Sequence, residues 1–165
     1  MQAVDIAKFS FQAVDVWMNQ GLLLTAGTFE ECNMMTVGWG SIGCMWSKPF
    51  VQVVVRPTRH TFGYMERSDS FTVCRFPAQF RGDLETLGTI SGRDGGKLGR
   101  TALTLKKSTI VASPSYNEAS LILECKKSYY QDFDPAHFID KSIDAHYEKR
   151  DYHRVYFGEI VAAFA

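Results

Sequence analysis

The sequence has 165 residues, of which 45% are hydrophobic and 22% are charged, an ordinary composition for a globular domain with a substantial core. Eighteen basic residues balance eighteen acidic ones, so no net field attracts nucleic acid or an anionic membrane. Any anion site must therefore be local. We expect one domain over residues 1–165.

The N-terminal residues MQAVDIAKFSF lack the charged leader and apolar segment of a signal peptide, and no apolar run approaches the roughly 20 residues that span a bilayer. We therefore expect a cytoplasmic protein. Its cysteines, Cys32, Cys44, Cys74 and Cys125, form no CxxC pair and no Cys/His cluster, and the histidines show no metal spacing. The sequence thus predicts reduced thiols and no metal, and redox chemistry would need a cofactor.

Strand signals dominate the chain. Helical spacing occurs over Phe9–Met18, Thr61–Arg67, Phe80–Leu87 and Pro135–Tyr147. Six segments have strand character, and a mainly β fold, a six-stranded β-barrel with peripheral helices, is favoured over a βαβ sheet. The six predicted strands are Leu22–Ala26, Met34–Trp46, Phe50–Val55, Ser70–Phe76, Ser120–Tyr130 and Val155–Phe164.

The turn Arg56–Thr61 joins a buried strand to a predicted helix. Arg56 and Arg59, a hydroxyl and the free N–H groups of a helix start would converge there, which suits a phosphate. Strand-to-helix turns with two arginines are also common on protein surfaces. The turn alone therefore leaves open a phosphate site and a solvated turn.

The segment Asn33–Trp46 mixes glycines, hydroxyls, an amide and two tryptophans, which is unusual for a plain strand. A flat ring rich in hydrogen-bonding groups would use them: glycines admit it, Thr36 or Ser41 addresses its polar edge, and aromatic or Met side chains cover its faces. A bent barrel strand would also explain the glycines. Both interpretations remain open from this segment alone.

Two further segments give weaker signals. The segment Ser91–Gly99, SGRDGGKLG, has neither GxGxxG nor GxxxxGK[ST] and is typical of a flexible surface loop. His153 begins the last predicted strand, where it could face a ligand or a neighbouring strand. No nucleophile elbow or catalytic triad is found.

In this order, LLLTAG, NMMTVGWGSIGCMW, VRPTRHT, SGRDGGKLGRTALT and YHRVYFGEIV resemble the flavin-reductase-like, FMN-binding split-barrel family, from Leu22 to Val161. The Trp-Gly-Ser that follows the Asn-Met-Met-Thr is most similar to the flavoredoxin-like branch. The resemblance implies a six-stranded split barrel, a homodimer, and FMN bound near the dimer interface.

The resemblance also implies site residues. It assigns no catalytic side chain beyond the flavin itself, with His153 and Lys97 as candidates for a place near the reacting ring. Ring and ribityl contacts would come from Asn33, Met34, Thr36, Trp39, Ser41 and Trp46. Arg56, Arg59, His60 and Thr61 would hold the phosphate, and Lys97 and Leu98 would lie over the flavin.

Three functions compete at this point. The first is an NAD(P)H-dependent FMN reductase, in which nicotinamide passes hydride to flavin. The second is a flavoredoxin-like electron carrier that serves a redox partner protein without a nicotinamide site. The third is a binding module for another flat ligand such as haem. The lack of a dinucleotide-binding motif does not distinguish these functions, because members of the family that the sequence resembles lack such a motif.

Overall fold

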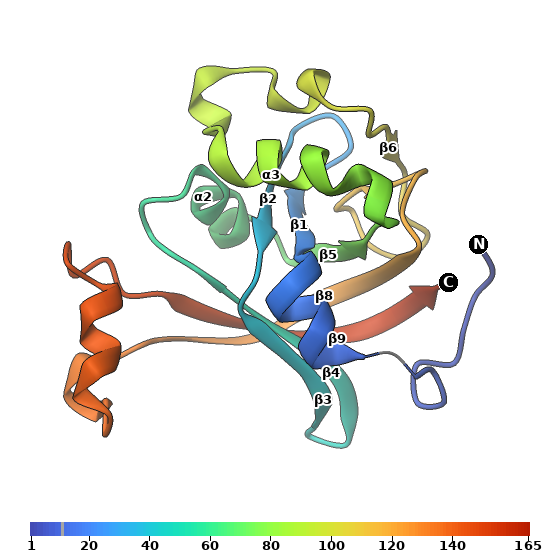
Figure 1. Cartoon of the computed structure of the whole chain (residues 1–165). Helices are drawn as coiled ribbons and strands as arrows, with labels where there is room; N and C mark the ends of the chain where they lie inside the picture. Colours follow the sequence, from blue (N-terminus) through green and yellow to red (C-terminus); the bar gives the residue numbers. More distant parts are fainter. Residues whose placement is uncertain (11) are drawn as a thin grey trace.

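The computed structural model of the chain describes residues 1–10 and 12–165. Phe11, inside the predicted helix Phe9–Met18, lies outside the described residues. Most of the chain forms one antiparallel sheet with the strand order β2-β1-β5-β8-β9-β4-β3 (Figure 1). Its strands are β1 (Leu22–Gly27), β2 (Cys32–Val37), β3 (Gly40–Met45), β4 (Lys48–Val55), β5 (Ser70–Arg75), β8 (Leu121–Asp132) and β9 (Arg154–Phe164).

The sheet curls into an open barrel. Strands β2 and β3 follow one another in the sequence but lie at opposite edges of the sheet, joined only by Gly38 and Trp39. Such a short link requires the two edges to approach each other without pairing. The single predicted strand Met34–Trp46 is thus wrong: the chain leaves one edge at Val37 and starts the other at Gly40.

The mainly β prediction is confirmed, but the number of strands is corrected. The sheet has seven strands, and β6 (Leu105–Lys106) and β7 (Ser115–Tyr116) form a separate two-stranded ladder. These two-residue strands are too short to leave a periodic signal in the sequence.

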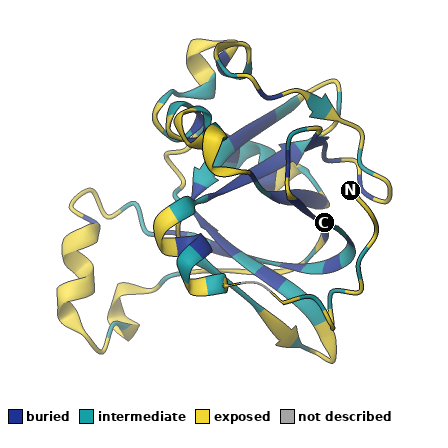
Figure 2. Cartoon of the chain, turned by 45° about the vertical axis from the view of Figure 1, so that its right-hand side comes forward, coloured by how far each residue is buried: buried dark blue, intermediate teal, exposed yellow. Residues whose placement is uncertain are grey.

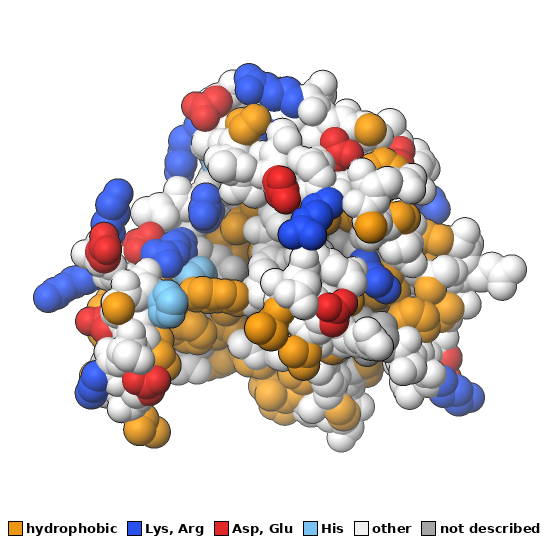
Figure 3. Space-filling model, in the orientation of Figure 1, with side chains coloured by type: hydrophobic (Ala, Val, Ile, Leu, Met, Phe, Trp, Pro, Cys, Tyr) orange, Lys and Arg blue, Asp and Glu red, His pale blue; other side chains and the backbone are white. Residues whose placement is uncertain are grey.

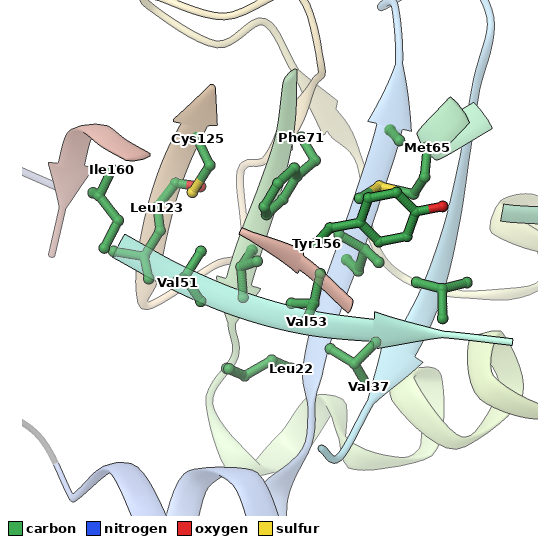
Figure 4. Close-up of a cluster of buried hydrophobic side chains, with 14 of the residues drawn as sticks. Leu22, Val37, Val51, Val53, Met65, Phe71, Leu123, Cys125, Tyr156 and Ile160 are labelled. Carbon is green, nitrogen blue, oxygen red and sulfur yellow. The ribbon is translucent and has the colours of Figure 1, made fainter. Parts of the chain in front are cut away.

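Both faces of the central strands are buried, which explains their nearly continuous apolar runs. In β1, Leu22 and Leu24 point into the barrel, whereas Leu23 points to a second cluster beneath α3. The barrel cluster also holds Val53, Phe71 and many others (Figure 4). The second cluster contains residues of β1, β2, β5, β8 and α3 and of the segment between α3 and β8.

The helices are short and peripheral. Helix α2 (His60–Arg67) follows β4, and α3 (Arg81–Thr89) follows the 3₁₀ turn η2 (Ala78–Phe80) and packs against β2. The predicted first helix is a three-residue α1 (Ala13–Asp15) continued by the π-helix η1 (Val16–Gln20). Among the described residues, no helix has the length and apolar character to cross a membrane.

Residues 133–153, here called the arm, connect β8 to β9 and project from the body (Figures 1 and 2). The helix predicted over Pro135–Tyr147 is instead two 3₁₀ segments, η5 (Pro135–His137) and η6 (Lys141–His146), each preceded by an aspartate that accepts a backbone N–H. Most of the arm is exposed, and neither 3₁₀ segment has a buried residue, so no apolar face stabilises a longer helix.

Candidate functional site

Two adjoining cavities lie where β4 passes into α2. The larger is about 600 Å³ and is bounded by the start of α2, the end of α3 and the arm. The smaller, about 230 Å³, shares Met35, Arg56 and Arg59 with it. Arginine and lysine side chains and histidines gather at the hollow between the arm and the body (Figure 3).

Arg59 lies at the junction of the two cavities. It is the residue before α2, with an extended backbone, and its side chain forms no hydrogen bond or ion pair with the described residues. In the first helical turn beside it, the Phe62 N–H donates to the Arg59 carbonyl at 3.0 Å, whereas the N–H groups of His60 and Thr61 lack a partner four residues earlier in the helix. A free guanidinium next to free N–H groups makes this corner attractive to an anion.

Arg56, by contrast, already holds the arm. Its Nη1 is 2.7 Å from Oδ1 of Asp151, and its Nη2 donates to the carbonyl of His146 at 2.8 Å. Its guanidinium also lies 4.9 Å from the centre of the Tyr147 ring. Arg56 therefore lines both cavities while fixing the arm against the body.

Asn33 and Thr61 form the buried floor of the larger cavity. Asn33 Nδ2 donates to Thr61 Oγ1 at 2.7 Å, and Thr61 Oγ1 donates to the carbonyl of Met34 at 3.3 Å. Gly92 closes over them: a Cβ at this position would collide with Asn33 Oδ1 and with the His60 ring. Only a glycine permits this close approach of the 3₁₀ turn η3 (Gly92–Asp94).

Lys97 enters the same cavity from η4 (Lys97–Arg100). Its Nζ donates to the carbonyls of Leu87 and Ile90, at 3.0 and 3.3 Å, at the end of α3. Burial, followed by the nearby Arg59 charge, lowers the Lys97 pKa to about 8. Burial, together with neighbouring cations, also lowers the pKa of His60. The SGRDGGKLG segment is therefore part of a cavity wall as well as a surface loop.

His153 and Trp39 line the smaller cavity. Their ring centres are 5.1 Å apart, and Trp39 is 48% exposed. His153 Nδ1 is 2.8 Å from the hydroxyl of Tyr147. Burial and then the Arg56 charge lower the His153 pKa to about 4, so the imidazole is neutral at pH 7. This wall is thus aromatic and uncharged.

The predicted site residues divide into two sets. Nine predicted residues line a cavity: Asn33, Thr36, Trp39, Arg56, Arg59, His60, Thr61, Lys97 and His153. The Thr36 hydroxyl is already used, since it donates to the Leu84 carbonyl at 2.5 Å. The other four predicted residues do not line either of the two cavities: Met34, Ser41, Trp46 and Leu98.

Strand geometry explains two of these absences. Met34 faces the cluster beneath α3, and the neighbouring Met35 lines both cavities. Ser41 lies on β3 and donates to Gln52. Space over Gly40, which was expected to admit a ligand ring, is filled by Trp17 of the chain itself.

Trp46 lies at the tip of the β3–β4 hairpin, and Leu98 lies in η4 next to Lys97. The Trp46 ring contacts Tyr129 and Phe157, with centres 6.1 and 6.2 Å apart. Leu98 packs against the cluster beneath α3. Any contact of these two residues with a ligand remains a prediction.

The structure adds residues that sequence reasoning missed. Arg93 lines the larger cavity and donates to the carbonyl of Thr58 at 3.1 Å. The missed set also includes Met35, Val54, the end of α3 from Leu87 to Ile90, and His146, Lys149 and Asp151 of the arm. Arg93 stood within a quoted segment, but nothing in the sequence signals that α3 and the arm reach this cavity.

Metal chemistry finds no support among the described residues, which contain no group of three or more His, Cys, Asp or Glu side chains suited to a metal ion. All four cysteines are free, and burial raises the pKa of Cys32 to about 11. The described residues that line the two cavities are mainly cationic, polar and aromatic.

Comparisons with solved structures decide the fold. A flavoredoxin from Methanosarcina acetivorans matches all of this chain and 76% of its own, with a TM-score of 0.71 and 21% identity. The FMN-binding domain of a flavin-reductases-like enzyme from Shewanella baltica matches 98% of this chain and 75% of its own, with a TM-score of 0.70 and 20% identity. The chain has the fold of these proteins.

The split-barrel prediction is therefore confirmed in part: the solved structures share the fold, but the sheet is open and has seven strands rather than six. The flavoredoxin of Desulfovibrio vulgaris (Miyazaki F) agrees, with a TM-score of 0.69 at 16% identity over all of this chain and 76% of its own. No family profile matches the sequence. An uncharacterised protein of Archaeoglobus fulgidus is 29% identical over 104 residues, which are 63% of this chain and 58% of that protein's length.

Proposed function

We propose that this protein binds FMN in the two joined cavities and is an oxidoreductase, an NAD(P)H-dependent FMN reductase. The observation that carries the proposal is the unpartnered Arg59 guanidinium at the junction of the cavities, beside the free N–H groups of α2. Structures of the same fold named as an FMN-binding flavin-reductases-like enzyme and as flavoredoxins support the choice of ligand.

The cavity residues fit FMN in charge and in shape. Arg59, which precedes α2, and the cations of the SGRDGGKLG segment suit the phosphate at one end, and the Trp39–His153 wall suits the flat ring at the other. Taken together, the two joined cavities, of about 600 and 230 Å³, lie in the usual range for a small-molecule site. Bound FMN would supply the hydride chemistry that these side chains lack.

Each side chain then has a physical task. Arg59 and His60 bind the phosphate, Asn33 offers an amide fixed by Thr61, and Lys97 adds a buried cation. The neutral His153 ring, held by Tyr147, excludes water from one side of the flavin ring.

A spectrum and a reductant test the proposal. The purified protein should be yellow or should gain flavin absorbance when FMN is added, and NADH or NADPH should bleach it under anaerobic conditions. A protein that takes up no FMN would refute the flavin site. A yellow protein that neither nucleotide bleaches would refute the reductase and leave the electron carrier.

The electron carrier is the second candidate, favoured by two neighbours named flavoredoxin. An aromatic patch, made of the exposed Trp46 and Tyr129 and the half-buried Phe157, offers a surface for a redox partner protein or a second copy. Reduction of the yellow protein by dithionite but not by nicotinamide, followed by electron transfer to a second redox protein, would identify the carrier.

We also propose a homodimer. Trp46 and Ser41 belong to the segment that resembles a flavin wall, but neither residue lines the cavities of its own chain. The cytoplasm is the proposed location, because four free thiols suit a reducing compartment.

A further inference from the structure

Lys97 is an unusual cation because it is buried and yet has no carboxylate partner. Only 5% of the residue is exposed. Its Nζ donates to the carbonyls of Leu87 and Ile90, and an ammonium group has three N–H donors. No further partner of Nζ occurs among the described residues. One donor is therefore left for the cavity that Lys97 lines.

The surroundings of this ammonium are mostly positive. The positive charges come from Arg59, just before α2, and from Arg93 of η3, while His60 of α2 and His146 of the arm are the neighbouring imidazoles. The end of α3 contributes carbonyl dipoles, which partly stabilise the charge. Across the cavity, the arm brings Lys149 with the carboxylates Glu148 and Asp151, and Asp151 is already bound to Arg56.

The protonation of Lys97 should therefore differ between the empty cavity and a cavity that holds an anion. Burial and the Arg59 charge favour loss of the proton, and together they bring the Lys97 pKa to about 8. A dianion in the cavity would reverse this balance, because an opposite charge within a few ångströms stabilises the ammonium form. Lys97 would then keep its proton well above pH 8.

We propose that Lys97 takes up a proton when the phosphate of FMN enters the cavity, so that phosphate binding and protonation of this buried amine are coupled. The proposal rests on the proposed function, whose ligand it uses. Lys97 thereby has two tasks: it fixes the end of α3 through two carbonyls, and it sets the pH range in which the phosphate is held.

Calorimetry measures the coupling directly. FMN is titrated into the wild-type protein near pH 8 in two buffers of different ionisation enthalpy, and the difference in heat gives the protons taken up. We expect uptake of about half a proton, since a group near its pKa is half ionised before binding. The dissociation constant should rise about five- to tenfold between pH 7 and pH 9.

Three variants assign the proton to Lys97. Lys97→Met should abolish the uptake and weaken FMN binding, whereas Lys97→Arg should abolish the uptake and keep tight binding, because guanidinium stays charged at pH 9. His60→Gln should keep the uptake near pH 8, since the lowered pKa of His60 leaves its imidazole neutral there.

Riboflavin, which lacks the phosphate, provides the last comparison. It should bind, if at all, without proton uptake. Uptake with riboflavin would overturn the phosphate as the coupled group, and FMN binding without uptake in the wild type would overturn the proposal while leaving the FMN site intact. Failure to bind FMN at all would instead refute the proposed function. If Lys97→Met does not fold, the two buffers and Lys97→Arg still decide.

Discussion

Arg56 and Arg59 are three residues apart in one turn, and they differ in what already binds them. Arg56 is held by Asp151, the His146 carbonyl and the Tyr147 ring, while Arg59 has no partner among the described residues. An anion that binds Arg59 breaks no existing interaction, whereas one that recruits Arg56 must compete with a carboxylate. We therefore expect the two arginines to have separate tasks.

Arg59→Ala should weaken FMN binding by about 1.5–3 kcal/mol, the range for a hydrogen bond to a charged group. Flavin fluorescence quenching measures the affinity. Arg67→Ala is a matched control, because Arg67 lies at the end of α2 and outside the cavity, and it should bind FMN as the wild type does. Equal affinities for Arg59→Ala and the wild type would show that the phosphate lies elsewhere.

His153 has a pKa of about 4 because burial and the Arg56 charge oppose its protonation. The unfolded chain binds a proton near pH 6.5, so the neutral ring stabilises the fold above that pH and this stability is lost as the pH falls toward 4. Urea unfolding should lose about 2 kcal/mol more between pH 7 and pH 5 in the wild type than in His153→Gln. Parallel pH profiles of the two proteins would contradict the shift.

The 3₁₀ turn η3 seals the larger cavity only because its first residue is glycine. A Cβ at Gly92 would strike Asn33 and His60. Gly92→Ala should cost about 1–3 kcal/mol in stability by overpacking and should also reduce FMN affinity. Gly99→Ala is the control, since nothing lies within 4 Å of its added Cβ and its φ is not positive. Thermal unfolding and FMN titration give both quantities.

The arm is fixed to the body through one half-buried ion pair and its neighbours. Asp151→Asn removes the carboxylate that binds Arg56 and Thr58. The free energy needed to open the arm should therefore fall by about 1–2 kcal/mol. Limited trypsin digestion should therefore cut after Lys149 or Arg150 several-fold faster, because cleavage follows the population of the open form.

Glu148→Gln is the control, because it also replaces a carboxylate of the arm by an amide. Among the described residues, Glu148 forms no hydrogen bond or ion pair. Equal digestion rates for Asp151→Asn and Glu148→Gln would mean that the contacts of the Tyr147 ring with Arg56 and of His146 with Trp39 hold the arm without the ion pair.

Element prediction succeeded where burial is two-sided and failed where tertiary contacts decide. Runs such as Phe50–Val55 predict β4 closely, because apolar β-branched residues have few alternatives. The break at Gly38-Trp39 was missed, since glycines within a strand signal curvature as readily as an end. Helical spacing in the arm predicts a helix, but no partner surface stabilises one there.

The candidate site shows the same contrast between residues that local sequence identifies and residues that tertiary contacts bring in. Arg59, Asn33 and His153 were predicted because they stand in or beside recognisable segments. The contributions of Leu87 and of the arm were not, since they depend on how α3 and β8–β9 are brought to the end of β4. Met34 is the predicted residue and Met35 lines the cavities instead, because the direction of alternation along β2 is set by packing against α3.

At the scale of the whole molecule, the hairpin tip has a feature that local preference does not favour. Trp46 and Ser47 both have positive φ, 53° and 58°, in a two-residue connection between β3 and β4. Asn-Gly is the usual sequence for such a turn, because left-handed backbone strains other residues. Trp46 is also 60% exposed, beside Tyr129 and Phe157. Strain together with an exposed aromatic patch points to a role outside the folded monomer.

Trp46→Asn should therefore weaken the proposed homodimer, because it removes the exposed ring while easing the backbone of the turn. Sedimentation velocity over a range of concentrations measures the self-association. Ser47→Gly is the matched variant: it relieves the neighbouring left-handed residue, should raise the free energy of unfolding by about 1 kcal/mol, and should leave the dimer intact. A wild-type protein that sediments as a monomer at all concentrations would refute the dimer. A dimer equally stable in Trp46→Asn would move its interface away from this hairpin.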